Sequence, residues 1–167
     1  MKTFKIQPLV LLLSVLTLFG CQKSTQDLTD TEKNEVEESI RQIMNDLDKT
    51  VEDHDFEKMM EYSWNDKDYI YVGNGTITKG WKNNYDVAST IHSNPKHQSF
   101  NVSYDELIVK VLSRDMAMVI GDGYFNNFPT DEGTKSLKMA VTFLFERIEG
   151  KWLLTVGHES TDEAINF

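Results

Sequence analysis

Apolar positions recur with a helical period near the start of the folded part of the chain. They follow one another at steps of 4, 3, 1, 3 and 4 residues, which places them on one stripe of a 3.6-residue repeat. The stripe consists of Val36, Ile40, Ile43, Met44, Leu47 and Val51. Thr29 and Glu32 precede it with the spacing of a capping box, and acidic residues such as Asp46 and Asp48 are assigned to the other face. The pattern predicts a long amphipathic helix, followed by a shorter one with Asp55 as its N-cap.

From residue 69 onward, apolar and polar residues alternate with the two-residue period of a half-buried strand. Turn residues divide this part of the chain into several segments, and we expect strands over 69–72, 76–78, 100–112, 116–128, 137–148 and 152–160. Gly80 opens a short helix that carries Trp81, Tyr85 and Ala88 at helical spacing. Helices followed by a long meander of strands predict an α+β fold, with a curved antiparallel sheet wrapped around the N-terminal helices.

The last two strands predict which residues face the helices. A two-residue loop over 149–150 places Phe145 opposite Leu154 and Val141 opposite His158, on an almost wholly apolar face. The opposite face is small and mixed, and it holds Ala140, Thr142, Leu144, Leu153, Thr155 and Gly157. A three-residue bulged turn would shift each pairing by one residue. The sequence leaves both registers open, and we prefer the first.

The N-terminal 20 residues are typical of a signal peptide. Lys2 and Lys5 precede an 11-residue apolar run over 9–19, which is too short for a helix that crosses a bilayer. The run ends at Gly20 and Cys21, and this junction resembles the lipobox of bacterial lipoproteins. The resemblance implies a cysteine that carries acyl chains such as palmitate, a membrane anchor, and a location in the bacterial cell envelope facing outside the cytoplasm. The alternative is an ordinary secretory signal followed by an incidental cysteine.

Composition limits the function classes for the rest of the chain. We expect a signal peptide over 1–20, a lipidated tether over 21–27 and a single domain over 28–167. With 27 acidic and 17 basic residues, the net charge of −10 argues against a nucleic-acid partner. Most of the excess acid lies in 21–68, which carries 15 acidic and 6 basic residues. The strand region is therefore closer to neutral, which favours an uncharged or weakly polar ligand.

The sequence contains no motif for a metal or a cofactor. A lone cysteine can form neither an internal disulfide nor a Cys-based zinc site. His54, His92 and His97 have no carboxylate or cysteine at ligand spacing, and the chain has no phosphate-binding loop or nucleophile elbow. We therefore expect no cofactor and no metal.

Several segments together resemble the nuclear-transport-factor-2-like superfamily, and its SnoaL-like branch in particular. They are the long first helix, Tyr62-Ser63-Trp64 before a strand, Lys79-Gly80 before the short helix, and the ending Gly-Lys-Trp-x5-His-x-Ser over 150–160. The resemblance covers about residues 30–162. It implies a cystatin-like cone, in which helices and a bent sheet enclose a central pocket and the outer sheet face often forms a homodimer.

Two polar residues are candidates for chemistry in such a pocket. His158 is predicted on the apolar face, where it is either a structural histidine with a buried hydrogen-bond partner or a ligand or acid/base group. Asp122 lies between Gly121 and Gly123, which indicate a bulge or bend in the strand. It is either a pocket carboxylate or a solvent-exposed acid at that bend.

Aromatic residues supply the remaining candidates for ligand binding, although core packing alone also explains them. They are Trp64, Tyr69, Tyr71, Trp81, Tyr85 and Tyr124. The catalytic residues of related families do not carry over. Ketosteroid isomerases, which share the fold, use an acid where this chain has Tyr71-Val72, and the paired histidine of other relatives is replaced by Val156.

Three functions follow as hypotheses. The first is a membrane-tethered binding module for a small, mostly apolar molecule or a partner protein. The second is an enzyme that uses His158 and Asp122 as an acid/base pair. The third is a dimeric structural module with a filled core, paired through its outer sheet face.

Overall fold

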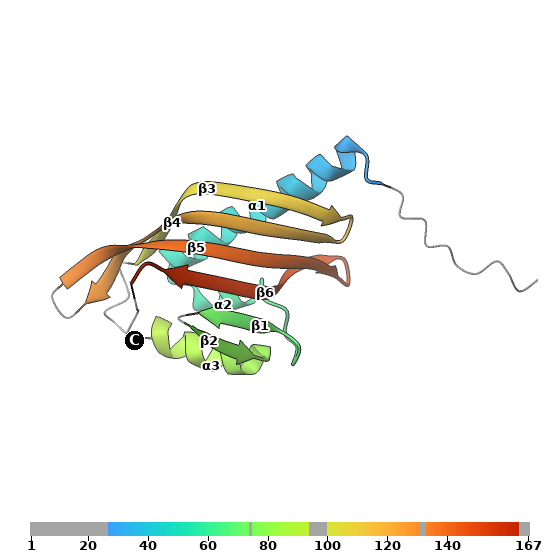
Figure 1. The fold of residues 1–167 in the computed structure, drawn as a ribbon. Coiled ribbons are helices and arrows are strands. Elements are labelled where there is room, and N and C mark those ends of the chain that lie inside the picture. Colours follow the sequence, from blue (N-terminus) through green and yellow to red (C-terminus); the bar gives the residue numbers. More distant parts are fainter. Residues whose placement is uncertain (1–26, 74, 94–99, 131–132, 164–167) are drawn as a thin grey trace, which may run out of the picture.

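The computed structural model describes residues 27–73, 75–93, 100–130 and 133–163, which form three helices and one sheet (Figure 1). The helices are α1 (Asp30–Glu52), α2 (Phe56–Met60) and α3 (Trp81–His92). The predicted signal peptide and Cys21 lie outside the described residues. Within the described ranges, no helix has the length and apolar character that crossing a membrane requires.

The first helix begins where the sequence predicts. The Thr29 hydroxyl accepts a hydrogen bond from the Glu32 backbone at 3.3 Å, and the Glu32 carboxylate accepts one from the Thr29 backbone at 2.9 Å. These two bonds form the capping box, so the prediction is confirmed. Val36, Ile40 and Met44 are buried along the predicted stripe, which fixes the face that α1 turns toward the sheet.

The sheet has six strands in the order β2-β1-β6-β5-β4-β3. Their bounds are Ile70–Gly73 for β1, Thr76–Lys79 for β2, Asn101–Ser113 for β3, Met116–Thr130 for β4, Gly133–Ile148 for β5 and Lys151–Thr161 for β6. The fold is α+β, as predicted. The sheet is mixed rather than fully antiparallel, because β1 runs parallel to β6 while the other neighbouring pairs are antiparallel.

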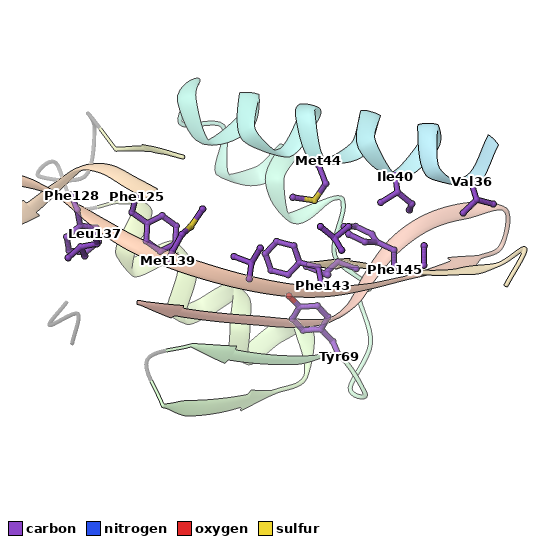
Figure 2. Packing of buried hydrophobic residues seen from close by; sticks show 14 residues of the cluster. Val36, Ile40, Met44, Tyr69, Phe125, Phe128, Leu137, Met139, Phe143 and Phe145 are labelled. Atoms are coloured by element: carbon purple, nitrogen blue, oxygen red, sulfur yellow. The ribbon is translucent and has the colours of Figure 1, made fainter. Parts of the chain in front are cut away.

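All three helices lie on the same side of the sheet, α1 across its long strands and α3 beside the short β1–β2 hairpin (Figure 1). Along β5 every second side chain is buried, which is the predicted alternation. Figure 2 shows Ile40 and Met44 of α1 pointing toward Phe143 and Phe145 of β5. The core therefore runs along the inner face of the sheet, from Val36 and Phe145 at one end to Phe128 and Leu137 at the other (Figure 2).

The sheet bends at Gly121 and Gly123, as expected, but the extra residue is in the partner strand. The pairing register between β3 and β4 changes between Tyr104 and Glu106 of β3, because Asp105 has no partner on β4. A Cβ atom at Gly123 would lie 2.0 Å from the Ser103 carbonyl oxygen. Glycine is required there because the β3 backbone presses against this point of β4.

The last hairpin has the predicted turn but not the predicted register beyond it. Glu149 and Gly150 have φ values of 51° and 81°, which suit a two-residue loop, and Phe145 faces Leu154 as expected. The next pair away from the turn joins Leu144 to Val156. Thr155 therefore has no partner on β5 and is the extra residue of a β-bulge.

This bulge is stabilised by the Thr155 side chain. Its buried hydroxyl donates to the Glu146 carboxylate at 2.9 Å and contacts the Leu144 carbonyl oxygen at 3.3 Å. As a result Val141 faces Glu159, and His158 faces Thr142 instead. The prediction that His158 points inward is wrong. The preferred register assumed regular pairing after the turn, whereas the bulge at Thr155 lies between the turn and His158 and reverses the face of each residue beyond it.

Candidate functional site

A cavity of about 580 Å³, here called the central cavity, lies between the helices and the inner face of the sheet. Its wall is formed by side chains from all three helices and from strands at both ends of the sheet. Most of the wall is apolar. Its apolar residues include Met44, Leu47, Val51, Met59, Ile91, Phe100, Val102, Phe125, Phe128, Phe143 and Leu154.

Asp48 brings a carboxyl into this wall from α1. It is four residues after Met44 and one after Leu47, so the helical period turns it toward the cavity rather than to the outer face. Burial raises the pKa of Asp48 from 3.8 to about 7, and the nearby Glu52 carboxylate adds to the increase in pKa. A carboxyl with this pKa is close to half protonated at neutral pH.

Glu159 brings a second carboxyl into the wall from the sheet. It lies on β6 between Val141 of β5 and Gly73 of β1. Burial raises the pKa of Glu159, and a hydrogen bond from the Tyr71 hydroxyl partly offsets that rise. The pKa of Tyr71 is raised well above its ordinary value, first by burial and then by the Glu159 charge.

Two further tyrosines add to the polar part of the wall, which also includes His54, Ser63, Thr76, Thr78, Asn84, His92 and Thr161. Tyr69 is 1% exposed, and burial raises the pKa of its hydroxyl, which is also hydrogen bonded to Ser63. Burial raises the pKa of Tyr104 on β3, and both the Asp48 and Glu159 charges raise it further. Tyr104 is therefore close enough to both carboxyls for the charge of each to raise the pKa of its hydroxyl.

Gly157 determines where the Tyr71 ring can lie. The two residues are partners in the parallel β1–β6 pair. A Cβ atom at Gly157 would come within 2.6 Å of the Tyr71 ring. One edge of the ring thus lies against the glycine, and its hydroxyl is hydrogen bonded to Glu159.

The predicted site residues divide into three groups. Tyr69 and Tyr71 line the central cavity. His158, Asp122 and Tyr124 do not line it, because their strand positions place them on the outer face. His158 is exposed, and the Asp122 carboxylate is 3.6 Å from the Lys138 ammonium.

The third group, Trp64, Trp81 and Tyr85, packs outside the central cavity. Trp64 contacts the hydrophobic core. The rings of Trp81 and Tyr85 stack with their centroids 5.0 Å apart, and the Tyr85 hydroxyl donates to Glu57 at 2.5 Å. The residues of α3 that do line the cavity are Asn84, Val87, Ala88, Ile91 and His92. Of the three residues predicted on this helix face, Ala88 lines the cavity and Trp81 packs against the hydrophobic core, which was the alternative explanation for it.

Sequence reasoning missed Asp48, Tyr104 and Glu159. Asp48 had a usable signal, because its spacing from Met44 and Val51 fits the apolar stripe. Tyr104 continues the alternation of Phe100 and Val102, although the bulge at Asp105 changes the phase of β3 directly after it. Glu159 faces inward in the alternative register of the last hairpin, which we did not prefer.

The central cavity can form hydrogen bonds with a ligand and can exchange protons with it. Of the described residues that line it, none is Lys or Arg, and its basic side chains are the imidazoles of His54 and His92. A search of the described residues finds no group of three or more histidine, cysteine or acidic side chains that could hold a metal ion. The chemistry of the cavity is therefore that of carboxyl, phenol and imidazole groups in apolar surroundings.

Comparison with known proteins gives one family and many similar structures. Residues 40–162 match the model of the SnoaL-like domain. No curated protein matches the chain.

The similar solved structures include proteins with and without a known reaction. A hexachlorocyclohexane dehydrochlorinase from Novosphingobium barchaimii is 19% identical with a TM-score of 0.66, over 81% of this chain and 92% of the other. An NTF-2 like protein of unknown function from Shewanella oneidensis is 20% identical with a TM-score of 0.62, over 74% and 97%. A protein with a cystatin-like fold from Nostoc punctiforme is 16% identical with a TM-score of 0.61, over 83% and 96%. At these identities the similarity establishes the fold.

Proposed function

The chain belongs to the SnoaL-like family, and we propose that its central cavity binds a small, mostly apolar molecule. The observation that supports this most directly is the cavity itself. Its volume of about 580 Å³ lies within the range of small-molecule sites, about 300–1,000 Å³. Its wall combines aromatic and aliphatic side chains with a few polar groups, which is the usual composition of such sites.

Filling the cavity tests the proposal. The buried core lies between Val36 and Leu154, so the chain expressed from residue 22 keeps that core and can be studied without a membrane. N-phenyl-1-naphthylamine, a neutral apolar dye, should fluoresce on binding to this protein. Ala88→Trp places a large ring in the cavity and should abolish the signal, whereas Ala140→Trp on the exposed outer face should keep it. Equal dye binding by both variants, or no binding by the unmodified chain, contradicts the proposal.

Acid–base chemistry on the bound molecule is a second candidate, favoured by the pKa of about 7 at Asp48. A carboxyl with this pKa can both donate and accept a proton near neutral pH. The pair His158 and Asp122 does not support an enzyme, since neither residue reaches the central cavity. If turnover of any substrate is found, Asp48→Asn should abolish it and His158→Ala should not.

We propose further that acyl chains on Cys21 anchor the domain to a bacterial membrane, on the side facing away from the cytoplasm. The support is the position of the only cysteine, directly after the apolar run and Gly20. In cells fed an alkyne analogue of palmitate, the full chain should be labelled and should sediment with membranes. Cys21→Ser should remove the label, and a labelled Cys21→Ser protein would contradict the proposal.

The outer sheet face supports a homodimer as a further proposal. Ile108 and Ile120 are 46% and 41% exposed and face each other across β3 and β4, beside Thr142 of β5. Thr155, which we expected in this interface, is buried in the β6 bulge and does not contribute. Sedimentation of the unmodified chain should give a dimer, and Ile120→Lys should give a monomer. A monomer without the substitution contradicts the proposal.

A further inference from the structure

We propose that the ligand of the central cavity is a hydrophobic organic cation, such as an alkyl- or arylammonium compound, held between Asp48 and Glu159. This inference rests on the proposed function, that the cavity binds a small apolar molecule, and adds the charge of that molecule.

The first argument is the missing counter-charge. Asp48 enters the cavity from the helix layer and Glu159 from the sheet layer. Acids removed from water are usually paired with a basic group, because an isolated buried charge is costly. Neither carboxyl takes part in any of the ion pairs found among the described residues. The described part of the wall offers two imidazoles, of His54 and His92, but no Lys or Arg, so a cation on the ligand would supply a permanently charged partner.

The second argument is the aromatic surface around these acids. Tyr71 and Tyr104 both interact electrostatically with Glu159, and Tyr104 does so with Asp48. Four phenylalanines continue the wall away from the acids. Aromatic faces attract cations, and the attraction is strongest where water is excluded. The same wall therefore suits both the charged and the apolar part of an organic cation.

The third argument is the comparison with other ligand charges. An anion would meet two carboxyls and no Lys or Arg among the described residues of the wall. A neutral molecule would gain only hydrogen bonds from the two carboxyls. A cation gains a charge pair in a medium of low dielectric constant, which is a stronger interaction than a neutral hydrogen bond.

Binding of a cation should also depend on pH and release protons. Asp48 interacts electrostatically with Glu52 of its own helix and with Tyr104 of β3. The other titratable groups of the wall are His54, Tyr69, Tyr71, His92 and Glu159. A cation favours the ionised form of Asp48, so its affinity should increase as the pH rises through about 7. The proton lost by Asp48 on binding would then appear in solution.

The test uses two probes of the same shape and different charge, on the chain from residue 22. Benzyltrimethylammonium carries a permanent charge, and neopentylbenzene is its neutral carbon isostere. Each competes with N-phenyl-1-naphthylamine for the cavity. At about pH 8 the cation should displace the dye at a concentration about tenfold lower than the neutral isostere, a factor that corresponds to about 1.4 kcal/mol. Asp48→Asn and Glu159→Gln should remove this preference, and Asp86→Asn, on the exposed face of α3, should keep it.

A measurement on the unmodified protein decides the matter even if a variant does not fold. Calorimetric titration with benzyltrimethylammonium at about pH 7, in two buffers of different ionisation enthalpy, should show proton release on binding. Equal displacement by the two probes, or no proton release, overturns the inference and leaves the proposed function intact. Absence of dye binding overturns the proposed function and this inference with it.

Discussion

Replacing Asp48 with asparagine should stabilise the protein above neutral pH and have little effect in acid. Asparagine has nearly the shape of the protonated acid but cannot ionise. The folded state raises the pKa of Asp48 from 3.8 to about 7. The folded protein therefore binds this proton more tightly than the unfolded chain, and stability from this group is lost as the pH rises.

The size of the effect follows from that difference in pKa. One pKa unit corresponds to about 1.4 kcal/mol, so the full shift at Asp48 would be about 4 kcal/mol. The carboxyl is only partly buried, and solvent screening reduces the expected effect to about 1–2 kcal/mol. Below about pH 4 the acid is protonated in both states, so the substitution should change little there. The gain should build up between about pH 4 and pH 7 and stay constant above that range.

Urea unfolding followed by far-UV circular dichroism measures this gain. The free energies of unfolding of the unmodified protein and of Asp48→Asn are compared from about pH 4 to pH 8. Acids that do not interact with Asp48 titrate equally in both proteins, so the difference reports Asp48 together with its neighbour Glu52. Asp86→Asn, an exposed acid, is the matched control and should show no such pH-dependent gain. Parallel stability curves for the unmodified protein and Asp48→Asn would refute the reasoning.

Three other substitutions test the backbone features that shape the cavity. Gly123→Ala should lower the free energy of unfolding by about 3 kcal/mol, because its methyl group would lie 2.0 Å from the Ser103 carbonyl oxygen; a change of urea midpoint within error would contradict this. Gly157→Ala should displace the Tyr71 ring and weaken dye binding several-fold, and unchanged binding would show that the ring position does not shape the cavity. Thr155→Val should cost about 1 kcal/mol in urea unfolding through its lost hydroxyl hydrogen bonds, whereas a stabilised variant would mean that they do not hold the bulge.

Local patterns in the sequence predicted the elements well. The capping box at Thr29 and the alternation along β5 depend on neighbouring residues, and both are found where expected. The loop at Glu149 and Gly150 also follows from local chemistry, since both residues adopt positive φ. The start of β5 at Gly133 was missed, because pairing with β4 extends the strand through residues without an apolar alternation.

The site was predicted less well because it depends on register over long distances. Tyr69 and Tyr71 follow from the position of β1 next to the core. Tyr104 lies directly before the bulge at Asp105, and Glu159 depends on the bulge at Thr155. A bulge is decided by contacts between strands, and one extra residue exchanges the two faces of everything beyond it. Sequence periodicity alone does not contain that information.

The Thr155 bulge gives the family a simple way to exchange the chemistry of this cavity. His158 and Glu159 are adjacent in sequence, and the single inserted residue decides which of them faces inward. If Thr155 were instead paired regularly with Leu144, His158 would face Val141 and enter the cavity, and Glu159 would move to the outer face. A change from an acidic pocket to one with a histidine base would then require no substitution of either side chain. Substitutions that remove or create a bulge in the last strand are thus a route by which this fold can acquire new ligands or reactions.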